Sequence, residues 1–247
     1  MSAGVIAVTL AALATALATG LGALPFVFVR DMSRRWLGVS NAIAAGIMLS
    51  ASGALLIEGV IRGVGRVFAG AALGAIFIAA THRALEGRDD LRFGNLNAHD
   101  AKKAILIVTV MTLHSFAEGV GVGVSYGGGV ELGIVITIAI AIHNIPEGLA
   151  ISLVLVPRGS SVRAAAGWSI FSSLPQPLVA PFAYLFVETF GPFLPVGLGF
   201  AGGAMIWLVL AELVPDARAE LDIRSLVLWL GGSAAAMALL QAILLGR

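Results

Sequence analysis

The sequence predicts an all-α membrane protein with eight transmembrane helices and both termini outside. Of its 247 residues, 59% are hydrophobic and only 12% are charged, whereas soluble domains are about 25% charged. The mean hydropathy is +0.99. Apolar runs of the roughly 20 residues that a helix needs to cross a bilayer recur along the whole chain, and Lys and Arg are unequally shared between the connections.

Eight apolar runs qualify as spans. We expect the connections to be short, apart from a polar cytoplasmic loop at about 83–102, and we expect residues 1–247 to form one transmembrane domain. The first run holds no Lys or Arg before Arg30, so we interpret it as a helix and not as a cleaved signal peptide. The expected spans are about 4–29, 37–61, 67–82, 103–126, 132–156, 164–187, 193–214 and 225–245.

Orientation follows from the Lys and Arg residues, which prefer cytoplasmic loops. With the N-terminus outside, 12 of these 15 residues fall in inner connections, and only Arg62, Arg66 and Arg247 fall outside. Both termini are therefore expected outside. Without cysteine there are no disulfides and no thiolate ligands, and no basic run indicates nucleic acid. The expected surroundings are the lipid bilayer of a bacterial cytoplasmic (inner) membrane, and a homodimer is one option.

Two of the spans contain the same polar pattern, a His followed four residues later by a Glu. His114 and Glu118 lie in the fourth span, and His143 and Glu147 lie in the fifth. Residues four apart share one helix face, and ionisable groups deep in a bilayer are costly, so they indicate a functional site. Two imidazoles and two carboxylates suit one divalent transition metal. Interhelical hydrogen bonding without a metal is the alternative.

Two further polar or soft side chains are expected at the depth of these motifs, namely Met48 in the second span and Gln176 in the sixth. Each lies about as far into its span as the histidines do, at about 1.5 Å of rise per residue. Gln176 stands between two prolines, which predicts a broken helix. Gln176 is a candidate neutral metal ligand, or a candidate hydrogen-bond donor to a metal ligand. Met48 is a candidate thioether ligand, with packing as the alternative.

Acidic residues near the span ends are candidates for an ion pathway. Glu58 lies near the outer end of the second span, and Glu212 and Asp216 lie at the inner end of the seventh. Carboxylates at opposite mouths attract an entering cation and receive a leaving one. Ordinary solvated helix ends are the alternative.

The motifs resemble those of the ZIP family of divalent-metal transporters, in its short prokaryotic-type branch. The resemblance implies a bundle of eight helices, both termini outside, a central metal site between helices 4 and 5, and import of metal toward the cytoplasm. Zn²⁺ is then the expected substrate, with Fe²⁺, Mn²⁺ and Cd²⁺ as alternatives, and no cofactor is expected. The matching pieces are ATGLGALP (18–25), AAGIMLSAS (44–52), HSFAEG (114–119), HNIPEG (143–148), LPQP (174–177) and FAGGAMIWLVLAELVPDA (200–217).

The chain departs from the family pattern where members can hold a second, neighbouring metal. By the resemblance, Ser115, Asn144 and Gln176 would line that second position, and all three are neutral. Only Glu118 and Glu147 supply negative charge, and together they match one divalent ion. We therefore expect one tight metal, with a second site weak or lost.

An intramembrane metal-dependent hydrolase is the alternative function. A zincin-type protease carries HExxH, in which the Glu beside the first His is the general base. This chain instead has HxxxE twice, and its two Glu residues would be ligands, which leaves no evident base. We therefore expect a transporter and not an enzyme.

Overall fold

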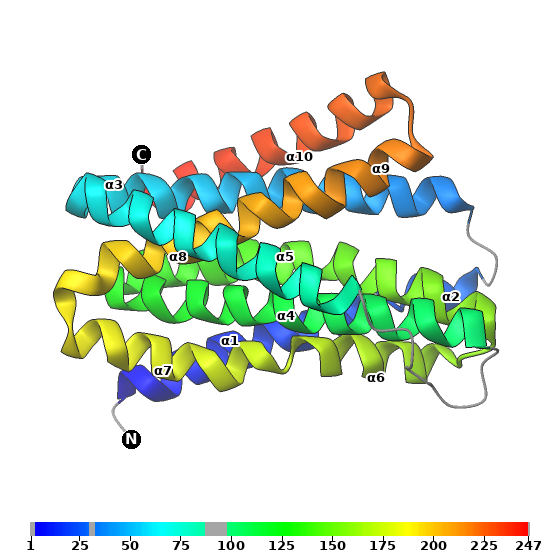
Figure 1. The fold of residues 1–247 in the computed structure, drawn as a ribbon, viewed down its shortest axis with the longest axis horizontal. Coiled ribbons are helices and arrows are strands. Elements are labelled where there is room, and N and C mark those ends of the chain that lie inside the picture. Colours follow the sequence, from blue (N-terminus) through cyan, green and yellow to red (C-terminus); the bar gives the residue numbers. More distant parts are fainter. Residues whose placement is uncertain (1–2, 30–32, 87–97, 247) are drawn as a thin grey trace.

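The computed structural model describes residues 3–29, 33–86 and 98–246, and within these residues the regular structure is entirely helical, as predicted. Figure 1 shows the long helices lying side by side in one bundle. The elements in chain order are α1 (Ala3–Leu21), α2 (Pro25–Phe28), α3 (Arg34–Glu86), α4 (Ala98–Gly128), α5 (Val130–Leu155), η1 (Val156–Arg158), α6 (Val162–Ser173), α7 (Pro175–Thr189), η2 (Gly191–Phe193), α8 (Leu194–Leu208), η3 (Val209–Leu213), α9 (Val214–Glu220) and α10 (Ile223–Leu244).

Six helical stretches among the described residues are long and apolar enough to cross a membrane. One of them holds both the second and the third predicted span, because α3 is two helices that meet at the non-helical residue Gly63. The fourth predicted span falls in α4, which is not one of the six. The count of eight stays a prediction. The six stretches are Ala3–Phe28, Arg34–Thr81, Val130–Arg158, Val162–Thr189, Gly191–Glu220 and Ile223–Leu244.

The predicted loop at about 83–102 is helical at both of its edges. α3 continues to Glu86 and α4 begins at Ala98, so the expected boundaries were too wide on each side. A polar composition does not end a helix once the turn is formed, because each further residue adds a hydrogen bond. Residues 87–97 lie outside the described part of the chain.

Two of the spans are interrupted. The sixth is broken where the two prolines predicted it: α6 ends at Ser173 and α7 begins at Pro175, since proline lacks an N–H and its ring obstructs the preceding turn. The seventh was expected as one helix, but five residues of π-helix, Val209–Leu213, separate α8 from α9. Hydrophobic periodicity does not reveal such a π-helical segment. Short π-helical segments inside α-helices are common near functional sites.

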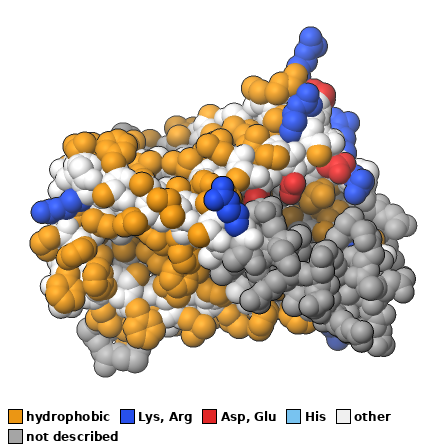
Figure 2. All heavy atoms as spheres, in the orientation of Figure 1, with side chains coloured by type: hydrophobic (Ala, Val, Ile, Leu, Met, Phe, Trp, Pro, Cys, Tyr) orange, Lys and Arg blue, Asp and Glu red, His pale blue; other side chains and the backbone are white. Residues whose placement is uncertain are grey.

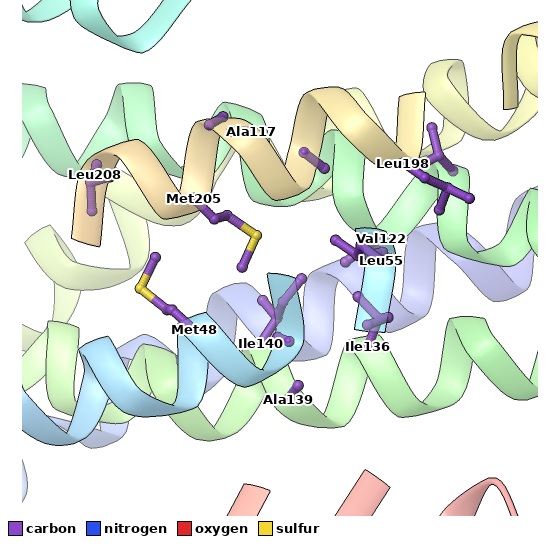
Figure 3. Packing of buried hydrophobic residues seen from close by; sticks show 14 of the residues in the cluster. Met48, Leu55, Ala117, Val122, Ile136, Ala139, Ile140, Leu198, Met205 and Leu208 are labelled. Carbon is purple, nitrogen blue, oxygen red and sulfur yellow. The ribbon is translucent and has the colours of Figure 1, made fainter. Parts of the chain in front are cut away.

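α3 and α8 approach each other closely through glycines on both helices. A Cβ added at Gly74 would lie 2.0 Å from the carbonyl oxygen of Phe200, and one added at Gly203 would lie 2.2 Å from that of Ala71. Small residues permit such backbone contact between membrane helices. Figure 3 shows the buried hydrophobic cluster beside this contact, which α3, α4, α5 and α8 line together.

On the face drawn in Figure 2, hydrophobic side chains cover most of the described surface. Leu178, Phe182 and Leu228 have 65%, 73% and 71% of their surface exposed. Such exposed apolar side chains suit a lipid environment, which has no water to form hydrogen bonds with polar groups. On the face in Figure 2, most Lys and Arg side chains gather toward the end at which α3 begins and α9 meets α10. Outside the candidate spans, Asp222 caps α10, and its hydrogen bonds from Ser225 and Arg224 lower its pKa.

Candidate metal site

The His and Glu residues of the two motifs converge between α4 and α5. One ligand atom from each of His114, Glu118, His143 and Glu147 lies within 4.8 Å of the other three. All four side chains are buried, and the largest exposure is 3%, at Glu147. The structure thus brings together the four residues that the sequence predicted as one site.

The contacts within this cluster join each His to both carboxylates. His114 Nε2 lies 3.2 Å from Glu118 Oε1 and 3.0 Å from Glu147 Oε1. His143 Nε2 contacts Glu118 Oε1 closely and lies 3.9 Å from Glu147 Oε1. A tetrahedral Zn²⁺ site with ligands at about 2.1 Å places its ligand atoms about 3.4 Å apart. The observed separations lie on both sides of this value, so the cluster could hold such an ion.

Hydrogen bonding satisfies only part of the cluster. Among the described residues, His114 Nε2 and Glu147 Oε1 have no hydrogen-bond partner despite their short separation. Buried polar atoms in proteins are almost always paired. Nitrogen and oxygen atoms that converge without the geometry of a hydrogen bond fit a shared cation better than the alternative of interhelical hydrogen bonding alone.

Beside Glu118, three side chains form a buried hydrogen-bonded network, which we call the amide network: Gln176, Asn144 and Thr15. Gln176 Nε2 donates to Glu118 Oε2 at 2.5 Å, and Thr15 Oγ1 donates to Gln176 Oε1 at 2.5 Å. Asn144 Nδ2 donates to the Thr15 carbonyl oxygen at 2.8 Å and to Gln176 Oε1 at 3.3 Å. All three side chains are fully buried. Gln176 therefore faces a predicted ligand as a donor.

Two other predicted ligands are Ser115, which is next to His114 in the chain, and Met48, which lies in the hydrophobic core. Ser115 is buried directly after His114 in α4. Met48 belongs to the hydrophobic cluster, where its side chain and that of Met205 point toward one another from α3 and α8 (Figure 3). Metal ligation by Met48, Ser115 or Asn144 stays a prediction.

The predicted pathway residues lie toward opposite ends of the bundle. Glu58 is near the turn of α3 at Gly63, whereas Asp216 is exposed in α9, and Figure 1 places these two segments at opposite ends. Glu212 is half-buried in the π-helical segment. Arg62 forms an ion pair with Glu58 at 2.7 Å. Glu58 also lines a cavity of about 660 Å³.

Sequence reasoning missed Thr15, and with it the contribution of α1 to the site. α1 buries one stripe of residues, and Thr15 and Thr19 are the polar members of that stripe. Two threonines four residues apart share a helix face, and in a helix whose other residues are Ala, Leu, Val, Ile, Gly and the less buried Thr9 this pair was a usable indication of a polar interface. Thr19 Oγ1 pairs with Ser173 Oγ at 2.7 Å.

The chain is similar in sequence to proteins named as zinc transporters, which fits a buried metal site. A protein of Arabidopsis thaliana with a provisional zinc-transporter name is 50% identical over 216 residues, which are 86% of this chain and 35% of that protein. The zinc transporter GufA of Myxococcus xanthus is 35% identical over 88% of this chain and 89% of its own. The zinc transporter ZIPB of Bordetella bronchiseptica is 31% identical over 81% of this chain and 69% of its own.

The family model described as ZIP zinc transporter matches residues 80–241, which contain both HxxxE motifs and Gln176. The match covers well over half of the chain, and the Myxococcus relative aligns over nearly its full length. Together with the buried His and Glu cluster, these matches show that the chain belongs to the ZIP family of zinc transporters.

Proposed function

We propose that this protein carries a divalent transition-metal ion, Zn²⁺ first of all, across a bacterial cytoplasmic membrane and into the cytoplasm. The observation that carries the proposal is the convergence of four buried metal-ligating side chains, two imidazoles and two carboxylates, within 4.8 Å. The relatives named as zinc transporters support Zn²⁺ as the substrate. Fe²⁺, Mn²⁺ and Cd²⁺ suit the same donor set.

His114, Glu118, His143 and Glu147 act as the ligands in this proposal. Two carboxylates alone leave a charge of −2 in a region where charge is expensive, and a bound divalent cation cancels it. The ion would leave its hydration shell at the site and meet nitrogen and oxygen ligands in return. Alternating access then exposes the loaded site first to one side of the membrane and then to the other.

The proposed topology has eight spans and both termini outside. Counting the two halves of α3 separately and adding α4 to the other stretches gives this number. An even number of spans returns the chain to its starting side, and Figure 1 shows both ends of the described chain toward one end of the bundle. The opposite end, where α9 meets α10, carries Arg218 and Arg224 and would be cytoplasmic.

Uptake of ⁶⁵Zn²⁺ into metal-free proteoliposomes tests the function. We expect saturable uptake by the wild-type protein and its loss in the double variant His143→Ala/Glu147→Ala, because half of the ligand set is removed. Gly167→Ala is a matched control, since its Cβ would meet no atom within 4 Å. Tight binding without uptake by the wild type would contradict transport of Zn²⁺, and Mn²⁺, Fe²⁺ and Cd²⁺ would be tested next.

The hydrolase alternative gains nothing from these observations. Members of the family are transporters, and the two Glu residues that could serve as a base both contact the His side chains as predicted ligands. A metal hydrolase needs an open coordination position and a base that is free to act.

A further inference from the structure

We propose that Thr15, on a helix without any predicted metal ligand, is a positioning residue that fixes the orientation of the Gln176 amide and thereby offers only one oxygen of Glu118 to the metal. The inference rests on the proposed function, because it concerns the same site. Three steps lead from α1 to Glu118: the Thr15 carbonyl orients Asn144, Asn144 and the Thr15 hydroxyl orient Gln176, and Gln176 holds Glu118.

In the first step, the Thr15 carbonyl oxygen, which can only accept a hydrogen bond, determines the orientation of the Asn144 amide. The Thr15 carbonyl oxygen lies 2.8 Å from the side-chain nitrogen of Asn144, and a backbone carbonyl has lone pairs but no proton to donate. Asn144 must therefore turn its NH₂ group toward α1. The Asn144 Oδ1 atom has no partner among the described residues, so nothing there favours the reversed orientation.

The second step fixes the amide of Gln176. Asn144 Nδ2 and Thr15 Oγ1 lie 3.3 Å and 2.5 Å from Gln176 Oε1. Thr15 Oγ1 also lies 2.7 Å from the carbonyl oxygen of Ala12, and its single proton serves one acceptor at a time. The hydroxyl alone would accept either amide orientation, but a reversed Gln176 would set NH₂ against the NH₂ of Asn144. Only the observed orientation is complementary throughout.

The third step acts on the metal ligand. With its carbonyl turned toward α1, Gln176 points its NH₂ group at Glu118 Oε2, 2.5 Å away. The other oxygen, Oε1, faces His114 and His143. Partners behind a ligand commonly set its orientation in this way, and their loss typically weakens metal binding about 10- to 100-fold.

Close backbone contact with α5 holds α1, the helix that carries Thr15, in place. A Cβ added at Gly148 of α5 would lie 1.7 Å from the carbonyl oxygen of Thr19, so α1 and α5 touch one turn away from Thr15. α1 also contacts α7, the helix that carries Gln176 as its second residue. A rigid contact of this kind lets a residue without ligand atoms preorganise the site.

Zn²⁺ binding to the purified full chain, measured by competition with a chromophoric chelator, tests the inference. Thr15→Val removes, at nearly constant size, the hydroxyl that lies 2.5 Å from Gln176 Oε1, but it keeps the backbone carbonyl that orients Asn144. Gln176 Oε1 then keeps only its longer hydrogen bond, from Asn144 at 3.3 Å, and holds Glu118 less firmly. We expect about tenfold weaker binding and a matching rise in KM for uptake with little change in maximal rate.

Thr15→Ser keeps the hydroxyl and is expected to restore wild-type affinity. Thr19→Val is the matched control, because its hydroxyl pairs with Ser173 and not with Gln176, and its affinity is expected to be unchanged.

A double-mutant cycle identifies the route of the effect. If Thr15 acts through Gln176, Thr15→Val will cost no further affinity in a Gln176→Ala background, because coupled residues are not additive. Thr15→Ala replaces the valine variant if the latter does not fold. Unchanged affinity in Thr15→Val, equal losses in Thr15→Val and Thr19→Val, or full additivity with Gln176→Ala each overturns the inference alone. A wild type without saturable Zn²⁺ binding overturns the proposed function and the inference with it.

Discussion

At the scale of single residues, the two oxygens of Glu118 have different partners. Oε1 contacts the two imidazoles, whereas Oε2 accepts a hydrogen bond from the amide of Gln176. A second cation on Oε2 would have to displace that amide, and the neighbouring Asn144 and Gln176 would add no charge to hold it. The structure therefore gives a physical reason for the single tight metal expected from the sequence.

This reasoning predicts the stoichiometry of binding. Calorimetric titration of the metal-free protein with Zn²⁺ is expected to show one tight equivalent per chain, which disappears in Glu147→Gln because one of two compensating charges is lost. Two tight equivalents that both disappear in Glu147→Gln would contradict the single site. Glu188→Gln is a suitable control, since Glu188 is exposed and hydrogen-bonds to Tyr184.

At the scale of elements, glycines determine how closely the helices around the site approach. Gly148 lies one residue after Glu147 and faces the backbone of α1, and Gly119 lies one residue after Glu118 and faces the backbone of α7 at Gln176. Each proposed carboxylate ligand is thus followed by a glycine that lets a neighbouring helix pack against the site. The HxxxEG pattern consequently combines ligation with close helix packing.

Gly148→Ala is expected to lower the thermal stability of the protein. The added Cβ would lie 1.7 Å from a backbone carbonyl oxygen, and overpacking of this kind costs typically 1–3 kcal/mol, occasionally more. Gly167→Ala, with open space around its Cβ, should instead gain roughly 0.5–1 kcal/mol from helix propensity. Thermal unfolding in detergent would compare the two. Equal stability of the two variants would argue against the α1–α5 contact.

At the scale of the whole molecule, the apolar face in Figure 2 and the Lys and Arg side chains near one end of the bundle are typical of a protein that spans a membrane. The chain reverses direction at Gly63, the non-helical residue within α3. Just before this turn, Arg62 forms an ion pair with Glu58 and donates a hydrogen bond to the carbonyl oxygen of Gly128, at the end of α4. The turn of α3 and the α4–α5 connection therefore lie at the same end of the bundle.

Cysteine labelling tests the proposed orientation, because the natural chain contains no cysteine. Gly65→Cys and Gly191→Cys, both exposed with open space around the new Cβ, are expected to react with a membrane-impermeant maleimide in intact cells. Ala219→Cys, exposed near the end of α9, is expected to react only after permeabilisation. The reverse pattern would place both termini in the cytoplasm.

Much of this molecule could be predicted from the sequence. The helical membrane class follows from composition, because a bilayer leaves a backbone few ways to satisfy its polar groups. The four central residues follow from spacing, because His and Glu four apart share a helix face at a depth where charge is costly. The break just before Gln176 follows from the prolines in this segment.

Other features were decided only by the tertiary structure. The hydrophobic pattern of α3 did not reveal that two spans merge at Gly63, and that of the seventh span did not reveal the π-helical Val209–Leu213. The role of Thr15 depends on contacts with residues 129 and 161 positions away in the chain. A hydrogen bond is directional and short-ranged, so which buried polar groups meet is settled only when the helices are in place.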